Sequence, residues 1–338
     1  MKYVQGLIVV FIALQIPIDE KRKKVLQSMM VFGGLYIATF CVFQYVRGDT
    51  LIQVRDGLFV DVGLRNLTGP FGASYFQLAQ TSSLFFIFSL FQSLQAKSLP
   101  MRFVYLAASC FISWPLFASG SRTGLGLFVV SLLVAIVVER RLRRTVLALG
   151  IVLIGFILIG FGHWVELLMS GNTLQRAVNM RDGSANGLAN RLLAVIHFPL
   201  STYAAGALVL AIGGGFYVAP VVINGVDLYR IDYGLHSFYL FPLEQGGVLA
   251  FTLFIYFIIS SFRHLQISRN TRNSTDRNFA NATFAYFVAT LVAGIGGHNF
   301  WQGFGSGNVN TLILLIVMLA LNPSRKINPE VIDKKGNI

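Results

Sequence analysis

The fold of this chain is decided by residues 103–138, which read FVYLAASCFISWPLFASGSRTGLGLFVVSLLVAIVV. Two apolar runs of helical length flank a short polar sequence, SGSRTG, at residues 119–124. A lipid-exposed backbone must satisfy its own hydrogen bonds, and a helix does this while crossing about 30 Å of hydrocarbon with about 20 residues. The stretch therefore predicts two transmembrane helices, 103–118 and 124–138, joined by a tight turn.

The same pattern extends over most of the 338 residues, of which 55% are hydrophobic and only 12% charged. Soluble globular chains carry roughly 25% charged residues. The composition excludes an ordinary soluble protein, a disordered chain and a disulfide scaffold, because the two cysteines lie inside apolar runs. We expect an all-α, polytopic integral membrane protein. The nine predicted transmembrane helices are residues 3–18, 25–46, 71–95, 103–118, 124–138, 145–161, 238–262, 280–297 and 309–322.

Four parts of the chain follow from these spans. An N-terminal bundle of six helices (1–161) precedes a large outer loop (162–237), three C-terminal helices (238–322) and a cytoplasmic tail (323–338). We expect amphipathic or re-entrant helices in the loop. The apolar segment 204–223 is long enough to span, but its three consecutive glycines and its proline disfavour a straight helix, so we expect it to be re-entrant or interfacial.

The distribution of basic residues predicts the topology. Eighteen of the 27 Lys and Arg residues fall in the loops after the first, third, fifth and seventh helices and in the C-terminal tail. By the positive-inside rule these segments are cytoplasmic. Residues 21–24, KRKK, follow the first helix, which favours an uncleaved helix over a signal peptide. The net charge of +13 is then a topology signal with anionic membrane lipids as neighbours, and nucleic acid is not an expected partner.

The SGSRTG turn is the first candidate site. An arginine at the centre of a membrane helix costs about 2.5–3.5 kcal/mol on insertion scales, so Arg122 is expected at the outer surface, where the fifth helix begins. The positive end of that helix, the Arg122 guanidinium and the Ser121 and Thr123 hydroxyls could together hold a phosphate, with Ser121 or Thr123 as the N-cap. The alternative is an arginine that only anchors a helix end.

Three further segments carry candidate residues on the predicted outer side. Arg191 lies in NRLLAVIHFPL (190–200), whose apolar stripe by itself favours an ordinary amphipathic surface helix with a solvated arginine. His236 stands at the start of the seventh helix and could exchange a proton, or simply bond the backbone. Glu244 is expected two turns deeper on a similar face of that helix. Supporting candidates are Tyr239 and His298; the latter lies beside Trp301 in the last outer loop.

Motifs for metal or nucleotide chemistry are missing from the sequence. It has no HExxH, paired CxxC, P-loop or GxGxxG motif, and its five histidines show no metal-ligand spacing. We therefore expect neither a metal nor another cofactor. A preformed or lipid-linked substrate fits an outer site better than a nucleotide does.

The ordered motifs resemble those of the bacterial O-antigen ligase and O-antigen polymerase family. The resemblance covers roughly residues 70–262. It consists of an S-R-[TGS] element at Ser121–Thr123, an R…Pro-Leu element formed by Arg191 with Pro199 and Leu200, and an H-[NS]-x-[YF]-L…E-x-G element from His236 to Gly246.

This resemblance implies a GT-C-like helical fold and a metal-independent glycosyltransferase in the bacterial cytoplasmic membrane, with its active site facing outside. The implied donor is an undecaprenyl-diphosphate-linked oligosaccharide, and the acceptor is either lipid A–core or another glycan. Arg122 and Arg191 would bind the diphosphate, and His236 would act on the acceptor hydroxyl or stabilise the departing charge. Ligase and polymerase share these motifs.

A permease or a lipid-linked oligosaccharide flippase is the alternative function. Transporters often consist of two matching halves with interrupted helices near the bilayer midplane. Here six helices precede the large loop and three follow it, and the candidate residues gather on one side, which favours the glycosyltransferase.

Overall fold

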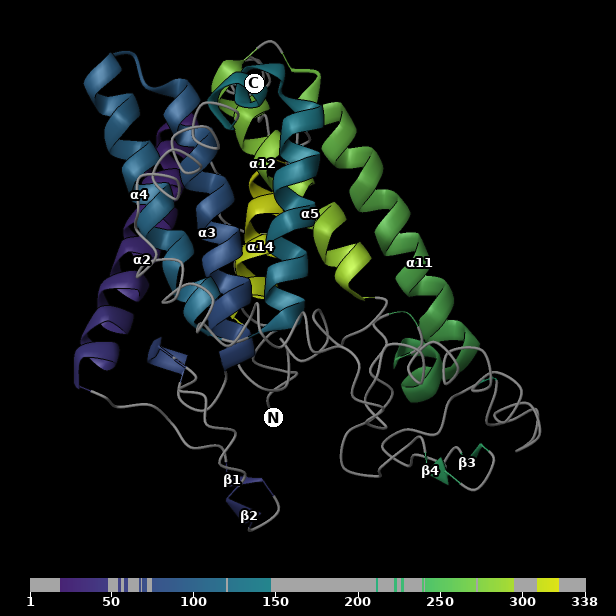
Figure 1. Ribbon diagram of the computed structural model, residues 1–338. Helices are drawn as coiled ribbons and strands as arrows, with labels where there is room; N and C mark the ends of the chain where they lie inside the picture. Colours follow the sequence, from purple (N-terminus) through teal and green to yellow (C-terminus); the bar gives the residue numbers. More distant parts are fainter. Residues whose placement is uncertain are drawn as a thin grey trace, which may run out of the picture.

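A computed structural model gives the fold of the chain (Figure 1). It describes residues 19–47, 54–55, 58–59, 67, 69–71, 75–119, 121–146, 211, 222–223, 226–227, 239, 241–271, 273–294 and 309–321.

Seven long helices account for most of this part of the chain. They are α2 (Glu20–Arg47), α3 (Tyr75–Gln95), α4 (Leu99–Ala118), α5 (Arg122–Val138), α11 (Phe241–Arg269), α12 (Ser274–Ala293) and α14 (Val309–Ala320). A short 3-10 helix, η1 (Gly69–Phe71), precedes α3, and residues 140–146 form one further helical stretch after α5.

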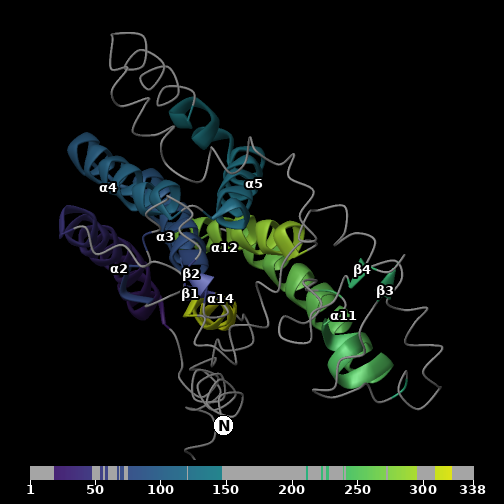
Figure 2. The ribbon, with the colours of Figure 1, turned by 60° about the horizontal axis from the view of Figure 1, so that its bottom comes forward.

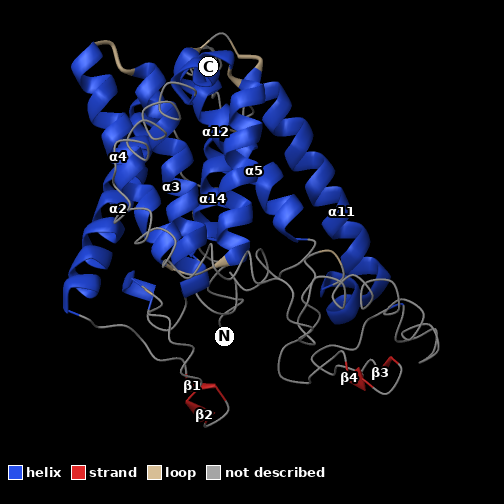
Figure 3. Cartoon of the chain, viewed as in Figure 1, coloured by secondary structure: helices blue, strands red, loops and turns tan. Residues whose placement is uncertain are grey.

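Two small antiparallel hairpins are the only strands among the described residues (Figure 3). In the first, β1 (Val54–Arg55) pairs with β2 (Leu58–Phe59). In the second, β3 (Val222–Ile223) pairs with β4 (Val226–Asp227). The second hairpin begins inside the apolar segment 204–223, so the last two residues of that segment are extended. All the long elements are helices, which confirms the expectation of a helical fold for them.

Each of these seven helices overlaps a predicted span. Three are long and apolar enough to cross a membrane, namely α2, α4 and the part of α11 from Gly246 to Arg269, while Thr123–Val138 is apolar but shorter. This agrees with a membrane-embedded helical protein. The predicted spans 3–18 and 145–161 lie outside the described residues, apart from the first two residues of the latter.

Four helices begin earlier than hydropathy indicates, and the difference is largest, at five residues or more, in α2 and α12. The sequence KRKK at 21–24 was predicted to be a loop, but it forms the first turns of α2, where the Asp19 side chain accepts a hydrogen bond from the Arg22 N–H at 2.8 Å. Likewise α12 begins at Ser274, not at 280, because Asn273 caps it by accepting from the Thr275 N–H at 2.9 Å. Capping side chains extend these helices past their apolar stretch.

The helices α3 and α12 form the centre of the bundle. The first packs against α2, α4, α5, α12 and α14, and the second against α3, α5, α11 and α14. Every side chain from Gln77 to Phe91 on α3 is buried. In both ribbon views α2 and α4 lie on one side of this pair and α11 on the other (Figures 1 and 2).

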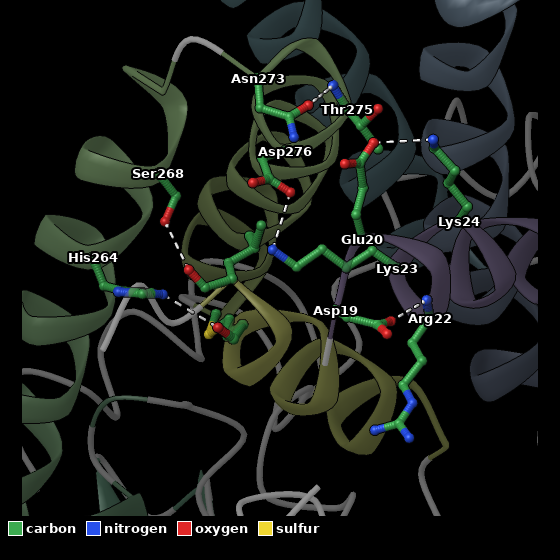
Figure 4. Close-up of polar contacts among 12 residues, drawn as sticks. Asp19, Glu20, Arg22, Lys23, Lys24, His264, Ser268, Asn273, Thr275 and Asp276 are labelled. Carbon is green, nitrogen blue, oxygen red and sulfur yellow. Dashed lines mark hydrogen bonds and ion pairs between the residues drawn. The ribbon is translucent and has the colours of Figure 1, made fainter. Parts of the chain in front are cut away.

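Each helix has its start at one end of the bundle and its last residue at the other end. We call one the basic end: it holds the start of α2, the end of α3, the start of α4, the stretch 140–146, the end of α11, the start of α12 and the end of α14 (Figure 1). Contacts there include the ion pair between Lys23 and Asp276 at 3.0 Å and the hydrogen bond from Ser268 Oγ to the Leu321 carbonyl at 3.3 Å (Figure 4). The predicted cytoplasmic segments that the structure describes all lie at this end.

Candidate functional site

The turn between α4 and α5 forms as the sequence predicts. Helix α5 begins at Arg122, and Ser121 is its N-cap, with Oγ accepting from the Gly124 N–H at 3.1 Å. Ser119 Oγ in turn accepts from the Ser121 N–H at 3.3 Å and donates to the Leu116 carbonyl at 2.8 Å. Both serines are almost fully buried. These hydrogen bonds link residues within the turn, so they fix the geometry of the start of α5.

A close contact with α3 fixes the same turn in the bundle. A Cβ atom built on Gly124 would lie 2.2 Å from the Ala79 Cβ, so only glycine permits this approach of α5 to α3. Ser83 Oγ on α3 lies 3.4 Å from the Gly124 carbonyl and 2.8 Å from the Ala79 carbonyl. The SRTG sequence therefore both starts α5 and packs it closely against α3.

The first turn of α5 presents backbone donors. By helix geometry the N–H groups of Arg122 and Thr123 have no intrahelical acceptor, and the positive end of the helix dipole lies beside them. Such an end favours an anion. Arg122 is placed by its backbone as the first residue of α5. The Thr123 side chain is half-buried beside it. Of the two predicted N-cap candidates, Ser121 is the cap, and Thr123 lies within the helix.

Tyr239 ties the segment before α11 to α12. Its phenol donates to the Leu291 carbonyl at 2.6 Å, in the last turns of α12. Tyr239 stands ahead of α11, and its phenol is neutral at physiological pH, so it remains a hydrogen-bond donor. The observed contact fixes Tyr239 against the end of α12.

The expected position of Glu244 is wrong. A straight helix from residue 238 would place Glu244 two turns deep, whereas α11 begins at Phe241 and Glu244 lies in its first turn. Pro242 explains the late start, because proline is tolerated in the first turn of a helix, where its missing N–H needs no partner. The helix is then interrupted at Gly246 and at Gly247, whose φ of 65° and ψ of −162° suit only glycine.

Tyr239 and the α4–α5 turn lie at the same end of the bundle. Helix α12 packs against α5 in antiparallel fashion, and its last turns receive Tyr239 (Figure 1). The end opposite the basic end therefore holds two separate groups, Ser121–Thr123 at the start of α5, and Tyr239 with the first turn of α11. Arg191, His236 and His298 lie outside the described residues, as does the Glu244 side chain. In the described part of the chain, no cluster of His, Cys, Asp and Glu could hold a metal.

Sequence reasoning missed a buried polar seam between α3 and α12. Tyr286 on α12 is 2% exposed and donates to the Gln80 carbonyl of α3 at 3.1 Å, next to the fully buried Ser82 and Ser83. The Ser82 hydroxyl, in the same region, has no hydrogen-bond partner among the described residues. The signal was present in the sequence QLAQTSS at 77–83, which places five polar residues in an otherwise apolar helix.

Comparison of the sequence with protein-family models and with curated proteins finds no match.

Proposed function

We propose that this protein is a membrane glycosyltransferase that transfers or polymerises glycan carried on undecaprenyl diphosphate, at the outer face of the bacterial cytoplasmic membrane. The observation that supports this most is the start of α5. Arg122 occupies the first position of a helix that is capped by Ser121 and docked on α3 through Gly124, at the end of the bundle opposite the basic residues.

This arrangement suits a lipid diphosphate. Charge that develops on a leaving diphosphate is stabilised best by donors that are already oriented, because they need no reorganisation during the reaction. A capped helix start supplies oriented N–H groups, and an arginine next to it supplies a guanidinium that pairs with two phosphate oxygens. The close contact of Gly124 with α3 keeps these donors in a fixed position relative to the bundle.

The proposed reaction is a direct displacement. The acceptor hydroxyl forms a bond to the anomeric carbon of the donor sugar while the bond from that carbon to the diphosphate oxygen breaks. His236 takes the hydroxyl proton, and undecaprenyl diphosphate leaves with the electron pair, its charge held by Arg122 and Arg191. The diphosphate linkage drives the transfer, so no nucleotide is consumed.

The decisive experiment compares two arginines at the same end of the bundle. Arg122→Ala should lower glycan transfer by at least about 100-fold in vesicles that contain the lipid-linked donor and either acceptor, lipid A–core or a second lipid-linked unit. Arg47→Ala is the control, because Arg47 is exposed at the end of α2 and belongs to no candidate motif. The His236→Ala variant should still bind the lipid-linked donor but should not transfer the glycan. Full transfer by Arg122→Ala would refute the proposal.

A flippase or permease is the second candidate, and the buried polar seam between α3 and α12 favours it. Polar side chains inside a membrane bundle often mark a transport path. The same vesicles separate the two functions. A flippase moves the lipid-linked glycan across the bilayer without lengthening it, whereas the proposed enzyme forms a new glycosidic bond that appears as a larger product on a gel.

A further inference from the structure

An arginine-rich groove opens at the basic end of the bundle, far along α5 from the turn discussed above. It has a volume of about 790 Å³. Its walls come from the first turns of α4 and from the helical stretch 140–146. The lining residues are Leu99, Arg102, Phe103, Leu106, Arg140, Arg141, Arg143, Arg144 and Thr145.

A break in the helix creates this groove. Glu139 ends α5 in an extended conformation, with φ −122° and ψ 101°, and the stretch 140–146 continues in another direction (Figure 2). Leu142 is fully buried and holds the stretch to the core. Arg102 Nη2 donates to Thr145 Oγ1 at 3.1 Å, which joins α4 to the stretch. The groove is therefore built by tertiary contacts, and its arginines come from two separate elements.

No ion pair compensates the arginines of the groove within the described part of the chain, and the one carboxylate beside it, Glu139, accepts from the Arg141 backbone N–H at 3.3 Å. Five guanidinium groups line it, and no carboxylate does. The two ion pairs found among the described residues lie elsewhere, between Lys23 and Asp276 and between Lys24 and Glu20. Five like charges around one groove repel one another, and an anion between them would relieve that repulsion.

The other wall of the groove is apolar and open. Leu99 is 66% exposed and Phe103 is 62% exposed, at the start of a helix that is itself apolar enough to cross a membrane. A ligand that fits must carry negative charge at one end and hydrocarbon at the other. Nucleic acid, free phosphate and an acidic peptide lack the second feature.

We propose that this groove binds an anionic glycerophospholipid of the bilayer, with its phosphate head group among the arginines and an acyl chain along Leu99, Phe103 and Leu106. Basic pockets between membrane helices are suited to such head groups, and each arginine near an anionic lipid surface adds to the affinity. The Arg102–Thr145 hydrogen bond makes the groove a site and not merely a region of positive charge. The proposal does not depend on the glycosyltransferase activity.

The test uses the full chain purified in detergent with equal amounts of phosphatidylglycerol and phosphatidylcholine, and native mass spectrometry to measure which lipid is retained. The wild type should prefer phosphatidylglycerol. The double variant R102Q and R144Q should lower that preference by about tenfold or more. The control, K21Q and R263Q, removes the same charge from exposed residues at the same end that do not line the groove.

A second measurement needs no variant, in case the double variant does not fold. A photoreactive phosphatidylglycerol with its reactive group near the glycerol should label wild-type peptides from residues 99–106 and 140–145, and unlabelled phosphatidylglycerol should compete. Labelling elsewhere, an equal loss of preference in both double variants, or no preference in the wild type would overturn the proposal. Displacement of the probe by soluble polyglutamate, but not by phosphatidylglycerol, would instead indicate an acidic protein segment as the ligand.

Discussion

The central helices and the outer helices of this bundle invert the usual rule for a soluble protein. The central pair, α3 and α12, buries Ser, Thr, Asn and Gln along most of its length. The outer helices α2, α4 and α11 expose large apolar side chains instead, such as Phe32, Phe103 and Leu253. In water this arrangement would be unfavourable, because large apolar patches drive association. In lipid it is stable, because the solvent is as apolar as the exposed surface.

The polar residues of the central pair are accommodated mostly within their own helices. Thr81 and Ser83 donate to carbonyls of α3 at 2.7 and 2.8 Å, and Thr283 and Thr290 do the same in α12 at 2.8 and 2.9 Å. Their side chains are small, so two backbones can come close together. The outer helices present apolar side chains to the lipid, and the central helices pack closely against their neighbours.

The largest effect is expected when a charged residue replaces an exposed apolar residue on an outer helix. Leu253 lies near the middle of the apolar part of α11 and is 61% exposed. Leu253→Arg would be almost harmless on a water-facing surface, but in a bilayer it should make the free energy of inserting α11 less favourable by about 3 kcal/mol. The measurement is the inserted fraction of the segment in a reporter protein with glycosylation sites on either side.

The matched control for this variant is Ile267→Arg. Ile267 is 63% exposed and lies close to Arg263 and Arg269, near the end of the helix, where a long basic side chain can reach the head groups. Its cost should be small. Equal insertion of both variants would show that α11 is not surrounded by lipid.

The contrast between the two sets of helices was only partly visible in the sequence. Hydropathy located the helices because their apolar composition is a local property. It could not assign α3 and α12 to the centre, because burial of Gln80 or Asn281 depends on neighbours contributed by other helices. The caps at Asp19 and Asn273 were also missed, since polar residues next to an apolar run were assigned to loops.

The candidate site shows the same division. Ser121 was one of two N-cap candidates drawn from a local pattern, and it is the cap, although α5 begins at Arg122, two residues before the predicted start at 124. The position of Glu244 was wrong because the helix was assumed to begin at residue 238, whereas α11 begins at Phe241. The contact between Gly124 and Ala79 required knowledge of which helix packs against α5, and no spacing within SGSRTG supplies it.

The second prediction concerns the close packing that the central helix α3 provides for α5. Gly124→Ala places a Cβ atom 2.2 Å from the Ala79 Cβ, so the two backbones must move apart. We expect a loss of about 2 kcal/mol in the free energy of unfolding. Reversible unfolding in mixed micelles with increasing dodecyl sulfate, followed by circular dichroism, measures it.

Gly126→Ala provides the internal control two residues later. Nothing lies within 4 Å of a Cβ atom at Gly126, so alanine should be neutral or should stabilise α5 by up to about 1 kcal/mol through its higher helix propensity. If both alanine variants had the same stability, the tight contact between α3 and α5 would not contribute to the fold.

The third prediction tests a polar contact that joins an outer helix to a central one. Arg269 of α11 donates from Nε to Asn281 Oδ1 of α12 at 2.9 Å, and its guanidinium carbon lies 4.3 Å from the centroid of the Phe284 ring. Asn281 is only 4% exposed. Asn281→Ala should cost about 1.5 kcal/mol in the same unfolding measurement, because it removes a hydrogen bond to a charged group.

Thr283→Val is the comparison for Asn281→Ala within the same helix. The Thr283 hydroxyl bonds only within α12, and valine has nearly the same shape, so the cost should be about 0.5 kcal/mol. A larger effect for Thr283→Val than for Asn281→Ala would mean that intrahelical bonds, not the contact between α11 and α12, stabilise the central pair.

The smallest effects are expected for two neighbouring lysines of α2. Lys23 pairs with Asp276 of the central helix α12, with side chains 14% and 20% exposed, whereas Lys24 pairs with Glu20 one turn away, with side chains 61% and 55% exposed. Lys23→Gln should cost about 1 kcal/mol and Lys24→Gln about 0.3 kcal/mol, because exposed pairs are weakened by solvent. Raising the salt concentration should abolish the effect of Lys24→Gln first. Equal costs would show that the ion pair between Lys23 and Asp276 does not hold α2 to the centre, which would leave the hydrogen bond from Gln92 of α3 to Gln27 of α2, at 2.8 Å, as a polar contact between α2 and the central pair.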